Sequence, residues 1–80
     1  MPAVPEAIAL HAGVLRSDAL VLADCAERLR DIGARLDAEG AAPQWLRDTV
    51  NAHIAACLRA STDLDEAATR LGVYADRARR

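Results

Sequence analysis

A seven-residue recurrence of apolar side chains runs through almost the whole chain. In the first half it consists of five large residues: Ile8, Leu15, Leu22, Leu29 and Leu36. A small residue follows each of the first four after four places: Ala12, Ala19, Ala26 and Gly33. Spacings of three and four residues place side chains on one face of an α-helix. The first half therefore predicts one long helix, with large and small residues alternating along its buried side.

The second half repeats this spacing. Its seven-residue series is Val50, Cys57, Leu64, Leu71 and Ala78, and the intervening series is Ile54, Ser61, Ala68 and Ala75. We call the residues of all four series the seam, and the first series of each half its main positions. Ser17-Asp18 and Thr62-Asp63-Leu64-Asp65 have the form of helix starts, but the spacing passes through both unchanged. Each half is therefore expected to be one uninterrupted helix.

The break between the halves is short. Gly40 suits the end of one helix, and Pro43 suits the first turn of the next. A short connection makes two helices antiparallel neighbours. We therefore predict an all-α fold, an antiparallel two-helix hairpin forming a single domain over residues 1–80. The first helix would span about 5–39, the turn 40–43 and the second helix about 44–79.

Two helices cannot bury all the apolar side chains of this sequence. We expect Asp18, Cys25 and Ile32 to flank the seam on one side, and Val14 and Val21 to widen it on the other. Leu10, Val14, Leu20 and Val21 cannot all share the seam, and Leu46, Leu58 and Val73 of the second half lie off it. This excess of apolar side chains predicts a helical partner or self-association, completing a four-helix bundle. The residues expected to pack the helices or meet the partner are Leu15, Leu22, Leu29, Leu36, Val50, Leu64 and Leu71.

Charge and hydropathy limit the classes of molecule that this chain is expected to bind. The net charge is −2 and no basic stripe is evident, which disfavours nucleic-acid binding. No apolar run approaches the length of a membrane span. The N-terminal segment lacks the basic region of a cleaved signal peptide. We therefore expect a protein made in the cytoplasm without such a signal.

The two cysteines lie opposite each other if the chain folds back at residue 41. On that basis we expect both Cys25 and Cys57 to face inward, where either a disulfide or two packed thiols would fit. His53 lies one turn before Cys57, so a small metal or redox protein using these three side chains is one hypothesis. No fourth ligand is evident, and we predict no metal or cofactor site.

Sequence motifs for catalysis are absent. The chain has no Gly-rich phosphate loop, nucleophile elbow or His-Glu-x-x-His motif. A two-helix hairpin also lacks the concave pocket of an active site. We therefore expect no catalytic residues, no small-molecule substrate and no enzyme activity.

The Ala-rich helix, the turn region with Trp45 and the second half, VNAHIAACLRASTDLDEAATRLGVYADRARR, carry a family resemblance. The chain resembles the Trp-x-Gly (WXG-like) superfamily of type VII (ESX) secretion substrates of actinobacteria, in particular its EspC-like branch. This implies a helical hairpin that dimerises with a helical partner and is exported by a type VII system.

The chain departs from the family pattern at two places. The turn reads Trp45-Leu46-Arg47, without the Gly, and the fourth residue after Tyr74 is Ala78 rather than the acid of the export signal. The resemblance therefore marks Tyr74 as a degenerate signal position, and a partner could supply the signal. Trp45 would cover the open end of the hairpin or, alternatively, anchor a partner.

A different class of function is also compatible with these residues. The hairpin could be a cytoplasmic adaptor, or an immunity or antitoxin-like subunit, that packs on an unrelated protein. That hypothesis predicts no export and a partner of different fold.

Overall fold

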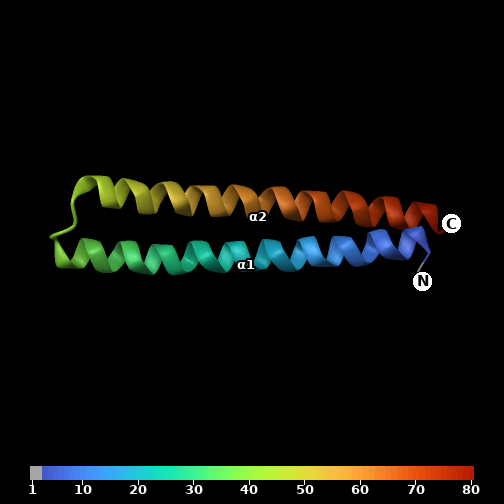
Figure 1. Ribbon diagram of the computed structural model, residues 1–80, viewed down its shortest axis with the longest axis horizontal. Coiled ribbons are helices and arrows are strands. Elements are labelled where there is room, and N and C mark those ends of the chain that lie inside the picture. Colours follow the sequence, from blue (N-terminus) through green and yellow to red (C-terminus); the bar gives the residue numbers. More distant parts are fainter. Residues whose placement is uncertain (1–2) are drawn as a thin grey trace.

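The computed structural model describes residues 3–80 and shows two long helices side by side (Figure 1). Helix α1 spans Val4–Glu39 and helix α2 spans Gln44–Ala78. They run antiparallel, so that the two termini lie at one end and the turn at the other. The predicted all-α hairpin is confirmed. Helix α1 begins one residue before the expected start, and α2 ends one residue before the expected end.

Gly40 and Pro43 define the turn. Gly40 adopts a left-handed backbone conformation, with φ of 70°, and its N–H donates to the Leu36 carbonyl at 3.2 Å. Glycine takes this conformation without the steric cost that a side chain brings. Pro43 directly precedes the first residue of α2, and its carbonyl accepts a 3.1 Å hydrogen bond from the Leu46 N–H. The turn is therefore made by the residues that predicted it.

Small seam residues form the centre of the helix contact. The buried hydrophobic residues are Ala12, Ala19, Ala26, Val50, Ala68 and Ala75. The seam leucines are only half-buried. A Cβ placed on Gly33 would stand 3.6 Å from Val50 Cγ1, an ordinary packing distance. Helix α1 thus lies directly on α2 through small side chains, while the larger ones border the contact.

Polar contacts between the helices mark one side of the seam. Arg16 Nε lies 3.8 Å from Asp65 Oδ1, and these residues directly follow the main seam positions Leu15 and Leu64. We call this side, bearing residues one place after each main seam position, the ion-pair face.

The opposite side bears the residues one and four places before each main seam position. Each residue advances about 100° around the helix axis, so residues that precede a main position lie on the other side of the seam from the residue that follows it. We call it the apolar face. The expectation that Val14 and Val21 lie across the seam from Cys25 and Ile32 is wrong. In the continuous helix α1 all four residues belong to the apolar face.

Candidate interaction surface

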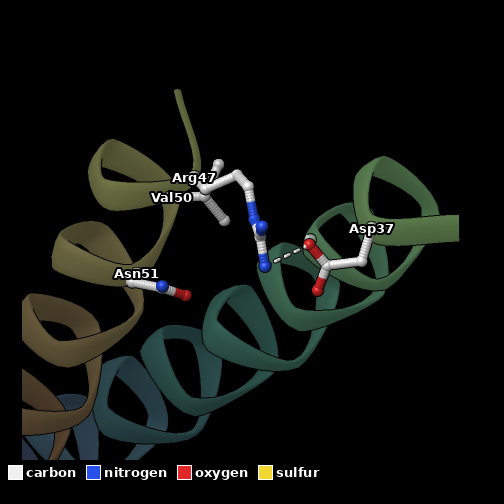
Figure 2. Close-up of a pocket in the computed structure, with 5 residues that line it drawn as sticks. Asp37, Arg47, Val50 and Asn51 are labelled. Carbon is white, nitrogen blue, oxygen red and sulfur yellow. Dashed lines mark ion pairs between the residues drawn. The ribbon is translucent and has the colours of Figure 1, made fainter. Parts of the chain in front are cut away.

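The ion-pair face is closed near the turn by a second cross-helix pair. Figure 2 shows Arg47 reaching from α2 toward Asp37 of α1, and Arg47 Nη2 lies 2.7 Å from Asp37 Oδ1. The adjoining cavity, lined by Gly33, Asp37, Arg47, Val50 and Asn51, has a volume of about 30 Å³, about the space of one water molecule. This arrangement fastens the end of the hairpin and leaves no room for a substrate.

A shallow groove lies midway along the same face. It is lined by Arg16, Ala19, Leu20, Ser61, Thr62, Asp65 and Glu66. Its two oppositely charged walls are joined by the Arg16–Asp65 pair, and the Ser61 hydroxyl donates to the Ala19 carbonyl at 2.7 Å. The polar groups of Arg16, Asp65 and Ser61 are therefore engaged in contacts between the two helices.

The apolar face lacks such cross-links in the described part of the chain. Its apolar residues and Cys25 are Val4, Ala7, Val14, Val21, Cys25 and Ile32 of α1 and Leu46, Ala56, Ala60, Ala67 and Tyr74 of α2. The remaining positions of the face hold the polar and charged residues His11, Asp18, Arg28, Arg35, Thr49, His53, Asp63, Arg70 and Arg77. Val21 is 65% exposed and Val14 is 55% exposed. None of the ion pairs found between residues 3 and 80 crosses this face. Its exposed apolar side chains suit packing against another protein surface.

The cysteines do not lie as expected. Cys57 is half-buried in the seam, whereas Cys25 is exposed, and both are free thiols. The expectation that both face inward is wrong for Cys25, because it lies four places before Leu29 and therefore on the apolar face. Folding the sequence back at residue 41 matches positions along the helix axis but does not give the direction of a side chain around it.

The hypothesis of a metal site gains no support from this placement. His53 is exposed, and within residues 3–80 no group of three or more His, Cys, Asp or Glu side chains could hold a metal ion. Cys25, Cys57 and His53 are therefore not assembled into a ligand set by the hairpin.

Trp45 and Tyr74 both project from α2 into solvent. Trp45 is 67% exposed and Tyr74 is 59% exposed. The expectation that Trp45 covers the open end of the hairpin is wrong, because the neighbouring Leu46 is the half-buried residue of this turn. The alternative role of Trp45, as an anchor for a partner, stays a prediction.

Sequence reasoning missed the cross-helix ion pairs. Arg16, Asp37 and Asp65 each directly follow a main seam position, where side chains of antiparallel helices meet at the edge of the contact. A search for opposite charges at these positions would have found Arg16 and Asp65. It would not have found Arg47, which lies three places before Val50.

Comparison with known proteins gives no assignment: no protein-family model, curated protein or solved structure matches this chain. Neither helix of the described residues has the length and hydropathy needed to cross a membrane.

Proposed function

We propose that this chain is a non-enzymatic helical interaction module whose apolar face packs on a helical partner to complete a four-helix bundle. One observation carries the proposal. No large side chain among residues 3–80 is fully buried, whereas nine large hydrophobic residues are exposed. Five of the nine lie on the apolar face: Val4, Val14, Val21, Ile32 and Tyr74. A chain that folds around five alanines and one valine gains little from its own core, so burial against a partner would add substantially to its stability.

The accessible surface supports the same conclusion. The chain exposes 5811 Å², whereas a compact monomer of 8.5 kDa is expected to expose about 4,700 Å². The excess, about 1,100 Å², exceeds the roughly 800 Å² that each partner of a standard interface buries. An elongated hairpin of 59 × 16 × 14 Å offers this area on a long side, where a second hairpin fits.

The type VII secretion role is a proposal from the family resemblance. The helix–turn–helix arrangement and an apolar face available for dimerisation support it. Because Tyr74 lacks the acid four residues later, we propose that the chain is exported, or acts in export, together with another protein, not a second copy of the chain, that carries the complete signal.

The test exploits two neighbouring residues on opposite faces. Val21 lies on the apolar face, and Leu20 lines the groove of the ion-pair face and is 70% exposed. The tagged chain and its Val21→Asp and Leu20→Asp variants would be purified from their host, and co-eluting proteins quantified by mass spectrometry. We expect a stoichiometric helical partner, or an untagged copy of the chain, with wild type and Leu20→Asp but not with Val21→Asp.

Two results would count against this function. Equal recovery of the partner with both variants would show that the apolar face does not bind it. Recovery of an unrelated toxin or enzyme, with no effect of secretion mutants on the location of the chain, would favour the adaptor or immunity function instead.

A further inference from the structure

The charged residues of the apolar face follow a pattern along its length. Asp18 of α1 lies level with Asp63 of α2, because nearby residues of the two helices meet in the contacts Arg16–Asp65 and Ala19–Ser61. Arg28 and His53 lie level with each other about ten residues nearer the turn. The face therefore carries two aspartates on one side of an apolar centre, which contains Val21, Cys25, Ala56 and Ala60, and an arginine and a histidine on the other side.

Two copies of the hairpin can stack face to face in two ways. If both turns point the same way, α1 of one copy lies over α2 of the other, and Asp18 meets the partner's Asp63. Like charges set directly against each other disfavour this arrangement. If the turns point in opposite directions, α1 lies antiparallel over the partner's α1. The acidic residues of one copy can then lie opposite the basic residues of the other.

We propose that a second copy of this chain covers the apolar face, in an antiparallel dimer whose two-fold axis passes between Val21 and Cys25. The inference rests on the proposed function and names its partner. In this register Asp18 lies opposite the partner's Arg28, and Asp63 lies opposite the partner's His53. Two-fold symmetry makes each of these pairs twice.

The apolar residues match in the same register. Val21 lies opposite the partner's Cys25, Val14 opposite the partner's Ile32 and Ala60 opposite the partner's Ala56. The side of the hairpin is long enough for an interface of standard size, given the 59 Å length of the molecule. One turn farther from the axis, Arg35 lies opposite the partner's His11 and Arg70 lies opposite the partner's Leu46, while Arg77 lies at the end of the face.

The contacts of Arg28 within its own chain leave it able to pair with an acidic residue of a second copy. Arg28 forms an intrahelical pair with Asp24 at 3.7 Å, and both side chains are strongly exposed. Exposed pairs of this kind contribute little, so Arg28 can turn toward a partner at small cost. Asp18 and Asp63 take part in no ion pair within the described residues.

Sedimentation equilibrium of the purified full chain tests the inference by charge exchange. We expect wild type at twice the 8.5 kDa chain mass. Asp18→Arg and Arg28→Asp should each raise the dimer dissociation constant about tenfold or more, and the double variant Asp18→Arg/Arg28→Asp should return it to within about threefold of wild type. Glu66→Arg changes charge by the same amount on the ion-pair face and should leave dimerisation unchanged. Circular dichroism would verify that each variant remains helical.

Either of two outcomes would overturn the inference. A wild-type chain that stays at 8.5 kDa up to millimolar concentration has no second-copy partner. A dimer that is equally weakened by Glu66→Arg, or not restored by the double variant, does not use this face in this register. In either case the proposed function would survive if a different helical protein were captured by wild type but not by Val21→Asp. Failure of the dimer inference can therefore be told apart from failure of the proposed function.

Discussion

The Ser61 hydroxyl of α2 donates a 2.7 Å hydrogen bond to the Ala19 carbonyl of α1. It is the one hydrogen bond of a side chain that joins the two helices among the described residues, apart from the ion pairs. Ser61 occupies a seam position where the neighbouring turns have Ile54 and Ala68. The hydroxyl at this position therefore adds a polar contact between the helices that an alanine could not make.

Ser61→Ala should lower the free energy of unfolding by about 0.5 to 1 kcal/mol. The lost hydrogen bond costs about 1 kcal/mol, and the better helix propensity of alanine offsets part of it. Urea denaturation followed by circular dichroism measures the change. Thr69→Ala is the matched control, because the Thr69 hydroxyl bonds the Asp65 carbonyl within its own helix. A Ser61→Ala variant as stable as wild type would show that this hydrogen bond does not hold the helices.

Ala26→Leu should destabilise the hairpin by about 1 to 3 kcal/mol, because the helices meet through small side chains and a larger one must push them apart. Ala26 is completely buried, whereas Ala34 of the same helix is exposed. Ala34→Leu should therefore have little effect in the same denaturation experiment. If Ala26→Leu proved neutral or stabilising, the close approach of α1 and α2 at this point would be incorrect.

Oxidation of the folded chain should not produce a Cys25–Cys57 disulfide. Cys25 lies on the apolar face and Cys57 in the seam, so the two Cβ atoms cannot approach to roughly 4 Å without rotating α1. Non-reducing mass spectrometry after mild oxidation detects the bridge as a loss of two hydrogens. The same treatment in urea, where the chain is free to close the loop, serves as the control. Rapid bridge formation in the folded chain would mean that Cys25 faces α2.

The hairpin itself was predictable because its signals agree at every level. The seven-residue spacing, the Gly40–Pro43 turn and the alanine content all favour two uninterrupted helices, and the structure has them. Every residue of the seam except Ala78 is buried or half-buried, because position within a continuous helix fixes the direction of a side chain around it.

The spacing of residues in the sequence did not predict the directions of some side chains or the ion pair near the turn, and each has a physical reason. Folding the chain back at residue 41 gives the level of Cys25 along the helix axis, but it does not give the angle of its side chain around that axis. The sequence left two roles for Trp45, covering the open end of the hairpin or anchoring a partner, and the first is wrong because the first turn of α2 directs Leu46 inward instead. The Asp37–Arg47 pair depends on the path of the turn, which the spacing of residues does not determine.

Photocrosslinking in the native host is the measurement that tests most directly whether the apolar face is an interface. A photoreactive phenylalanine derivative would replace Val21 in one variant and Leu20 in another, since these adjacent, exposed residues lie on opposite faces. The account predicts a strong crosslink to a helical protein, either a partner or a second copy, from position 21 and little from position 20. Equal crosslinking from both positions, or none from position 21, would contradict it.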